Sequence, residues 1–118
     1  MAAPNIGAFT YMYGNTAVQA ISNSTTAIVT NSPSSNQLYK IYSLSIANIT
    51  STNVTGIVDL YRSSTPYRMA GNINVPANTT LVLITKDNGV YLNEGDSLRL
   101  TAGSNSSLEA VCSYEVIA

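Results

Sequence analysis

The chain has 118 residues, of which 45% are hydrophobic and 9% charged, and its formal net charge is −1. This length suits one globular domain that holds a core without disulfides. The sequence contains no histidine, the usual general base and metal ligand. We therefore expect a protein that is not an enzyme and that needs no metal or cofactor. Five Lys and Arg against six Asp and Glu provide no basic face, which argues against nucleic acid as a partner.

No apolar run approaches the roughly 20 residues of a membrane span. The first ten residues, MAAPNIGAFT, lack the basic start and apolar centre of a secretory signal. We therefore expect no membrane partner and no Sec-dependent export. The single cysteine, Cys112, cannot form an internal disulfide, and its neighbours predict a strand, so we expect a buried core thiol.

Ser, Thr and Asn make up about a third of the chain and are interleaved with Val, Ile, Leu and eight Tyr. This composition is typical of β-sheets joined by turns, and no segment has the spacing of an amphipathic helix. Weak strands are predicted at residues 9–13 and 17–21, and a further strand at 25–30. Residues 38–49 give the strongest strand signal, with Tyr42, Leu44 and Ile46 on one face. Residues 54–62 repeat the alternation, and we expect these two strands to pair as a hairpin.

The second half of the chain predicts a short strand at 67–70 and a run at 80–85 that is apolar on both faces, as in a central or subunit-facing strand. Turns are expected at 87–89, where Asn and Gly tolerate positive φ, and at 94–96. Strands follow at 90–92 and 97–101, the latter with Arg99 outward. The last strand, at 108–117, has one continuous inward face: Leu108, Ala110, Cys112, Tyr114 and Val116.

Seven or eight short strands at this spacing predict an all-β fold, a single antiparallel β-sandwich of jelly-roll or immunoglobulin-like type. We assign residues 16–118 to the sandwich domain and residues 1–15 to an N-terminal arm. The arm is too apolar for a solvated tail and too broken by Pro and Gly for a good strand, which favours packing on a neighbouring subunit. Its candidate contact residues are Phe9, Tyr11, Met12 and Tyr13.

Acidic and amide residues offer several candidate sites, none of them strong. Asp87 with Asn88, and Asn93 with Glu94 and Asp96, lack the spacing of a calcium loop, so turn residues that bond their own backbone are the better interpretation. Glu94 and Asp96 are too close together for a glycosidase acid and base. Sequons occur at Asn23, Asn48, Asn53, Asn78 and Asn105, but composition alone predicts roughly three, which disfavours glycosylation.

Three further tyrosines, Tyr39, Tyr61 and Tyr67, are not on obviously inward positions. Exposed aromatic faces on a sandwich can stack on sugar rings, as in lectin-like modules. Tyrosine is also enriched in subunit contacts, where one end of the ring is dry and the other wet. Both alternatives remain open for these residues.

Four segments carry a resemblance: IYSLSIANIT, VTGIVDLYRSS, INVPANTTLVLITKDNGVYLNEGDSLRLTA and LEAVCSYEVI. Together they contain an A-N-I-like turn, a V-P-A-N-T-T-L turn, an L-x-E-G-D-S-L-R-L strand pair and an S-Y-E-x-I terminus. In this order they resemble the small β-sandwich structural proteins encoded in the virion modules of tailed bacteriophages, especially marine cyanophages. The resemblance covers residues 38–118, and the ordered set is more specific than E-G-D-S-L alone.

The resemblance implies a virion structural protein that is made in the host cytoplasm and located on the capsid surface. A capsid decoration (cement) protein would bind the major capsid protein and itself, as a homotrimer at three-fold positions. A neck, tail or fibre-attachment component of the same virion is the alternative. A carbohydrate-binding module that uses the exposed tyrosines is a third hypothesis, from another class of function.

Overall fold

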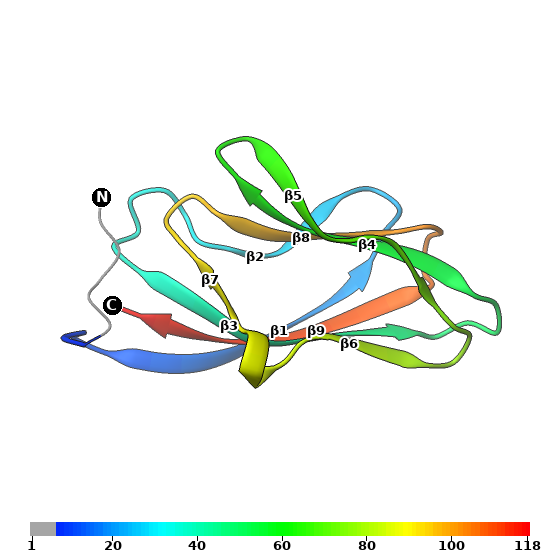
Figure 1. Cartoon of the computed structure of the whole chain (residues 1–118), viewed down its shortest axis with the longest axis horizontal. Helices are drawn as coiled ribbons and strands as arrows, with labels where there is room; N and C mark the ends of the chain where they lie inside the picture. The colour runs from blue at the N-terminus through cyan, green and yellow to red at the C-terminus, as the bar shows by residue number, and fades with distance from the viewer. Residues whose placement is uncertain (1–6) are drawn as a thin grey trace.

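The computed structural model describes residues 7–118 and shows two antiparallel β-sheets packed face to face (Figure 1). The predicted β-sandwich is therefore confirmed. One sheet has five strands in the order β1-β9-β3-β6, with β7 also paired to β3, and the other has the order β2-β8-β4-β5. The elements are β1 (Met12–Ile21), β2 (Thr26–Thr30), β3 (Leu38–Asn48), β4 (Val54–Arg62), β5 (Thr65–Val75), β6 (Thr80–Ile84), η1 (Lys86–Asn88), β7 (Val90–Leu92), β8 (Ser97–Ala102) and β9 (Leu108–Ile117).

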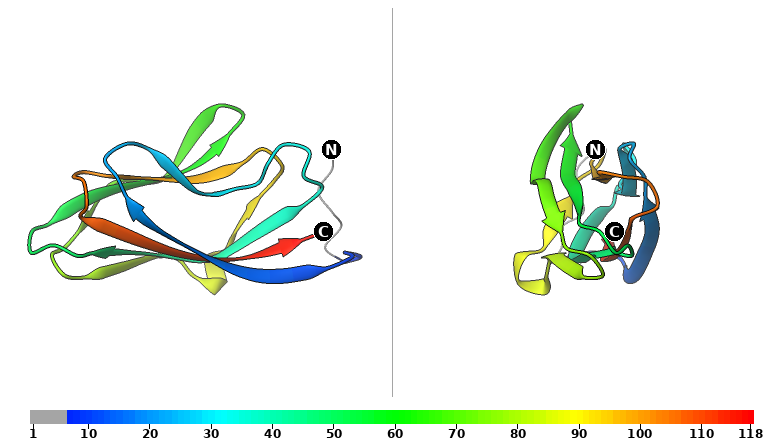
Figure 2. Two further views of the ribbon diagram at one scale, coloured as in Figure 1. Left: turned by 180° about the vertical axis from the view of Figure 1, so that it is seen from behind. Right: turned by 90° about the vertical axis from the view of Figure 1, so that its right-hand side faces the viewer.

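The strand order is that of a jelly roll. Strands β6 and β7 pair one after the other with β3, so they act as one strand interrupted by the 3-10 turn η1. The chain changes sheet at nearly every connection, and β4 with β5 forms a hairpin within one sheet (Figure 2). This alternation is how two Greek keys wrap into a double-sheet jelly roll. Within residues 7–118, no helix is long and apolar enough to cross a membrane.

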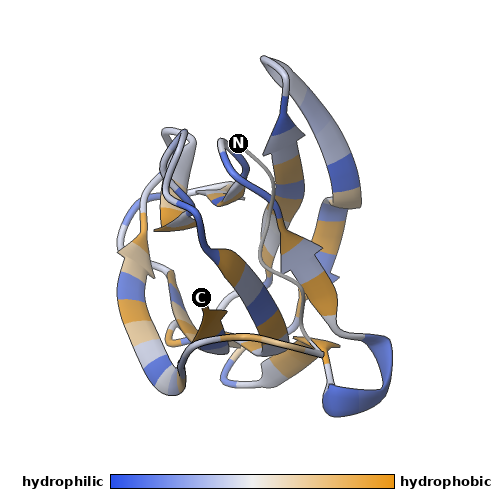
Figure 3. Cartoon of the chain, turned by 90° about the vertical axis from the view of Figure 1, so that its left-hand side faces the viewer, coloured by the Kyte–Doolittle hydropathy of each residue, from blue (hydrophilic) through white to orange (hydrophobic). Residues whose placement is uncertain are grey.

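The core lies between the sheets and is formed by one side of each strand. Figure 3 shows the resulting bands of hydrophobic and hydrophilic residues along the strands. The inward face predicted for β9 is confirmed, since Leu108, Ala110, Cys112 and Val116 are buried. Tyr114 shares that face but lies near its end and is only partly buried. The fully buried large side chains include Ile21, Ile41, Leu44, Ile46, Ile84, Leu92, Leu98, Leu100 and Leu108.

A β-bulge corrects the predicted inward face of β3. Ile41 lies opposite Tyr114, but Ser43 rather than Tyr42 lies opposite Ser113, so Tyr42 is the extra residue. The bulge reverses the alternation at this point and buries Ile41 with Leu44, while Tyr42 is only half-buried. The prediction that Tyr42 points to the core was therefore wrong, because period-two reasoning assumes an unbroken ladder.

The predicted hairpin of β3 with β4 is also wrong. The two strands belong to different sheets, and β4 pairs with β5 and β8. The connection between them is held by the buried Asn48, whose Nδ2 donates to the carbonyls of Thr52 (2.8 Å) and Val75 (2.9 Å). The side-chain oxygen of Asn48 accepts from the backbone N–H of Thr50 (2.9 Å). These side-chain bonds satisfy backbone groups that a hairpin would have paired, and they stabilise the connection from β3 in one sheet to β4 in the other.

Two further strands differ from expectation. The short strand predicted at 67–70 is part of β5, which runs over eleven residues and forms an edge of the four-stranded sheet. Strand β6 is an edge strand bonded only to β3 and not a central one; Val82 on it is exposed. Of the two predicted turns, the one at 87–89 is the 3-10 turn with Gly89 at φ −60°, and positive φ occurs instead at Gly95 (φ 88°).

The outer face of the four-stranded sheet carries a row of charges. Asp59 on β4 lies between Arg99 on β8 and Arg68 on β5, and its carboxylate accepts from Arg99 Nε at 2.8 Å and faces Arg68 Nη1 at 3.6 Å. Arg99 also lies over the ring of Tyr61, 3.9 Å from its centroid. Asp59 is therefore buried although it faces outward. The single carboxylate of Asp59 is thus paired with two arginines on this face.

Candidate interaction surface

The described residues contain no group of three or more potential metal ligands. Two of the turn residues, Asp96 and Asn88, bond their own backbone as predicted, whereas Glu94 accepts from the distant N–H of Asn36. Asp96 accepts a hydrogen bond from the backbone N–H of Asn93 (2.8 Å) and a bidentate pair from Arg62 (3.0 and 2.5 Å). Asn88 accepts from the backbone and hydroxyl of Thr85.

Three of the predicted contact tyrosines meet at the end of the sandwich where the C-terminus lies (Figure 1). The rings of Tyr11 and Tyr13 are stacked with centroids 5.7 Å apart and 9° between their planes. Those of Tyr39 and Tyr114 are stacked at 5.5 Å and 13°. We call Tyr11, Tyr13, Tyr39 and Tyr114 the tyrosine cluster.

Strand pairing explains why these rings meet. Tyr13 and Tyr39 lie on either side of Val116, because β1 and β3 both pair with β9. The backbone groups of Tyr11 and Ala118 exchange hydrogen bonds of 2.9 Å, which place Tyr11 one step further along the same face. Residues 12–16 of β1 are exposed on both faces of the strand, so the second sheet does not cover this end of the inner face.

The polar groups around the tyrosine cluster are partly occupied. Asn15 Nδ2 donates to the hydroxyl of Tyr114 (3.0 Å), and Gln37 Nε2 donates to the hydroxyl of Tyr11 (3.2 Å). Partial burial, and then the neighbouring hydroxyls of Tyr114, Tyr13 and Tyr11, raise the pKa of Tyr39 above its usual value. The cluster presents aromatic surface, with Tyr11 44% and Tyr13 49% exposed.

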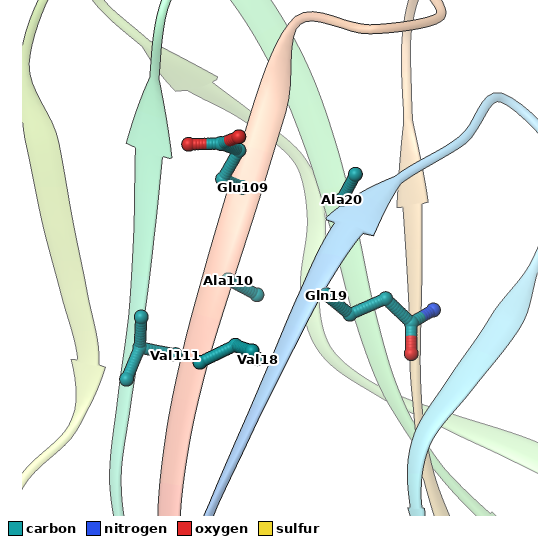
Figure 4. Close-up of a pocket in the computed structure, with 6 residues that line it drawn as sticks. All are labelled: Val18, Gln19, Ala20, Glu109, Ala110 and Val111. Atoms are coloured by element: carbon teal, nitrogen blue, oxygen red, sulfur yellow. The ribbon is translucent and has the colours of Figure 1, made fainter.

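A second exposed surface is the outer face of the five-stranded sheet. Val18 on β1 lies opposite Val111 on β9; Val111 lies opposite Ser45 on β3, which in turn lies opposite Val82 on β6. The three valines are 73%, 43% and 56% exposed in the order Val18, Val111, Val82. We call Val18, Val111, Ser45 and Val82 the valine row. Figure 4 shows Val18 and Val111 side by side in the surface depression that they line with Glu109, Ala110, Gln19 and Ala20.

The remaining predicted contact residues lie apart from the tyrosine cluster. Tyr61 is under Arg99 on the other sheet, and Tyr67 is 57% exposed on the β4–β5 hairpin. Phe9 and Met12 are 41% and 47% exposed, near the start of β1. Strand β1 starts inside the range assigned to the arm, and residues 1–6 of that range lie outside the described residues. Packing of the arm on a neighbouring subunit stays a prediction.

Sequence reasoning missed Val18 and Val111 as surface residues, whereas Val82 lies in the run at 80–85 that was expected to be central or subunit-facing. Tyr114 was assigned to the core because it alternates with Cys112, and it packs against the core but is only partly buried. The valines had a usable signal, since Val111 stands in the outward half of the β9 alternation between Glu109 and Ser113.

Comparison with known proteins supports the fold. No protein-family model and no curated protein matches the sequence. The solved structures similar to this chain include a subunit from the disulfide-linked pili of Bacillus endospore appendages, with 13% identity and a TM-score of 0.56 over 100% of this chain and 96% of that one. A pentameric capsid protein from metagenomic phage sequences occurs in two structures, both 20% identical over 86% of this chain, with TM-scores of 0.43 and 0.42. The chain spans 61% and 59% of those two capsid chains.

Proposed function

We propose that this protein is a non-catalytic structural component of a tailed-phage virion, and specifically a capsid decoration protein that binds the major capsid protein. The observation that carries the proposal is a pair of weakly charged exposed surfaces, the valine row on the outer face of the five-stranded sheet and the tyrosine cluster on the uncovered end of its inner face. Soluble monomers rarely expose large apolar patches, and tyrosine is enriched where proteins meet. The resemblance of residues 38–118 to phage virion proteins supports the same role.

Such a protein would act by burying surface on the capsid lattice. The expected assembly is a homotrimer at a three-fold position, with β6 or the N-terminal residues at the subunit contact. Val82 on β6 supports the first choice, because it projects from an edge strand and is 56% exposed.

Copy number per virion tests the location. Quantitative gels of purified virions from the phage that encodes this chain are expected to show on the order of hundreds of copies, as symmetric occupation of the capsid lattice requires. On the order of ten copies would instead place the protein in the neck or tail, and absence from the virion would overturn the proposal.

A matched pair of variants tests the surface. Val111→Lys places a charge in the valine row and is expected to weaken binding to capsids stripped of this protein by at least about tenfold. Ile49→Lys changes another exposed apolar residue, 53% exposed just beyond β3, and is expected to bind like the parent protein. Equal capsid binding by the parent protein and Val111→Lys would show that the valine row is not part of the capsid contact.

Carbohydrate binding remains the second candidate because of the stacked tyrosines. The amides of Asn15 and Gln37, which sugar hydroxyls would need, already donate to tyrosine hydroxyls. A glycan array is expected to show no binding. Binding that is lost in Tyr13→Ala would favour the carbohydrate module instead.

A further inference from the structure

Strand β1 forms an edge of the five-stranded sheet that lacks the usual protection of edge strands. Strand β1 runs for ten residues along this edge and pairs with β9 from Met12 to Ile21 without a register shift. It contains no charged residue and no proline. Natural sheet edges are normally blunted by charge, proline, bulges or short length, because an unprotected edge pairs with other strands.

The other edge strands of the described chain carry such protection. Strand β2 has five residues and a register shift, and β6 has five residues and a shift in its pairing with β3. Strand β7 has three residues. Strand β5 is long but contains Pro66 and Arg68 and two register shifts. Strand β1 alone among these is long, regular and uncharged.

The backbone groups that β1 directs outward can be identified. Tyr11 and Ala118 form a doubly hydrogen-bonded pair, and such pairs alternate along an antiparallel ladder. The odd-numbered residues of β1 therefore bond to β9. The N–H and C=O groups of the even-numbered residues point away from the sheet. The even-numbered residues are Met12, Gly14, Thr16, Val18 and Ala20, and all of them are exposed.

One side-chain bond agrees with this assignment. The N–H of Thr16 donates to Asn15 Oδ1 at 2.8 Å, as a group that faces away from β9 can. Within residues 7–118, the other even-numbered residues of β1 make no backbone hydrogen bond to a segment outside the ladder with β9. The edge thus offers a row of donors and acceptors at the spacing of a β-ladder.

We propose that β1 pairs antiparallel with β1 of a second copy, about a two-fold axis through Thr16, to form one continuous sheet across two subunits. In this register Gly14 lies opposite Val18 of the partner subunit, and Met12 lies opposite Ala20 of the partner subunit. In this register even-numbered residues pair with even-numbered residues and the strand ends match. All outward-pointing N–H and C=O groups of the strand can then bond across the seam once the N–H of Thr16 exchanges its bond to Asn15 Oδ1 for one to the partner strand.

Side-chain chemistry favours a second copy as the occupant. Strand β1 brings no charge to the seam, so two copies do not repel each other there. Glu115 lies beside Gly14, and that row would continue into Val18 and Val111 of the partner subunit, so no carboxylate faces a carboxylate. On the other face, the half-exposed ring of Tyr13 would gain Gln19 of the partner subunit as its neighbour. A two-fold axis also closes the contact and prevents chain growth.

The two-fold contact is compatible with the proposed trimer. Strand β6 lies at the opposite edge of the same sheet, so β1 remains free when β6 is used. Pairing of β1 is tested in purified protein and particle binding is tested with capsids, so each can fail without the other.

Amide hydrogen exchange measured by NMR over a range of protein concentrations tests the pairing. The amides of Gly14, Val18 and Ala20 are expected to exchange at least about tenfold more slowly as concentration rises, while Ala17, already bonded to β9, is protected throughout. Val18→Pro removes an edge N–H where an edge strand tolerates proline. It is expected to keep the fold and weaken the dimer at least about tenfold, whereas Val18→Thr keeps the N–H and the dimer.

Cross-linking tests the identity and symmetry of the occupant. Thr16→Cys is expected to give covalent dimers with a short bis-maleimide, because the two residues meet at the axis. Val111→Cys is the control. It lies one strand in from the edge and level with Val18, so its copy is three strand spacings away and four residues further along the strand, about 20 Å in all, and it is expected not to cross-link. Fast exchange of Gly14, Val18 and Ala20 at every concentration would overturn the pairing. Concentration-dependent protection of these amides without cross-linking at residue 16 would mean that β1 pairs with a strand other than β1 of a second copy, and would overturn the proposed two-fold contact.

Discussion

Cys112 illustrates how burial alone determines the behaviour of a reactive side chain. It lies between Ala17 and Leu44 on the inner face of the five-stranded sheet and is inaccessible to solvent. Burial raises the pKa of the thiol from 9.0 to about 12. The native protein is expected to resist maleimide at neutral pH, and rapid labelling without unfolding would show that this face is open.

The raised pKa of Cys112 also predicts an alkaline loss of stability. Below the unfolded pKa of 9.0 the thiol is neutral in both states, and above it the unfolded chain releases the proton more readily than the native protein. Stability is therefore lost as pH rises from 9 toward 12, on the order of 2–3 kcal/mol by pH 11. Urea unfolding of Cys112→Ala should show a flatter pH dependence than the parent. An identical alkaline slope would contradict the assignment.

The charge row on the four-stranded sheet allows a graded test. Arg99→Gln leaves the buried carboxylate of Asp59 with one distant partner, and is expected to cost about 3 kcal/mol. Arg68 is 54% exposed on its side chain and 3.6 Å from Asp59, so Arg68→Gln is expected to cost less than about 1 kcal/mol. Chemical denaturation measures both, and equal effects would show that Asp59 does not depend on Arg99.

At the scale of elements, two sequon asparagines near the β3–β4 connection have opposite hydrogen-bond roles. The amide of Asn48 donates to two carbonyls, so Asn48→Asp is expected to cost about 2–4 kcal/mol by setting a carboxyl against them. The side-chain oxygen of Asn53 instead accepts from the N–H of Ala77 at 3.1 Å, and Asn53→Asp keeps that acceptor. Asn53→Asp should stay within about 0.5 kcal/mol of the parent. If Asn48→Asp left the free energy of unfolding unchanged, the hydrogen bonds of Asn48 would not be what stabilises this connection.

At the scale of the whole molecule, deletion of residues 1–15 separates folding from attachment. Residues 12–15 pair with β9 along one side only and are exposed, so the truncated protein is expected to keep a cooperative thermal transition. Binding to capsids is expected to fall by several kcal/mol, because each buried large side chain contributes about 1.5–3 kcal/mol. The double variant Tyr11→Ala/Tyr13→Ala keeps the backbone and should reproduce most of the loss. A non-cooperative melt of the truncated protein would show that the segment belongs to the core.

Alternation along single strands could be predicted from the sequence, because the direction of successive side chains is a local property. Leu98 and Leu100 point inward and Arg99 outward as expected, and the inward face of β9 holds through Val116. Turn chemistry was likewise readable, as the bonds of Asp96 and Asn88 show. The candidate contact residues Tyr11, Tyr13 and Tyr39 were named from the sequence as separate residues.

Only the tertiary structure decided which strands are neighbours, because the order of strands in a sheet depends on contacts distant in the chain. The tyrosine cluster exists because β1 and β3 flank β9, and the valine row exists because the same strands and β6 share a register. The bulge at Tyr42 and the burial of outward-facing Asp59 likewise arise from partner strands. A residue's neighbours in sequence determine neither the register of its strand nor which side chains from other strands cover it. By itself the sequence determined the β-sandwich and the near absence of charge, whereas packing decided which uncharged surfaces remain open to a partner.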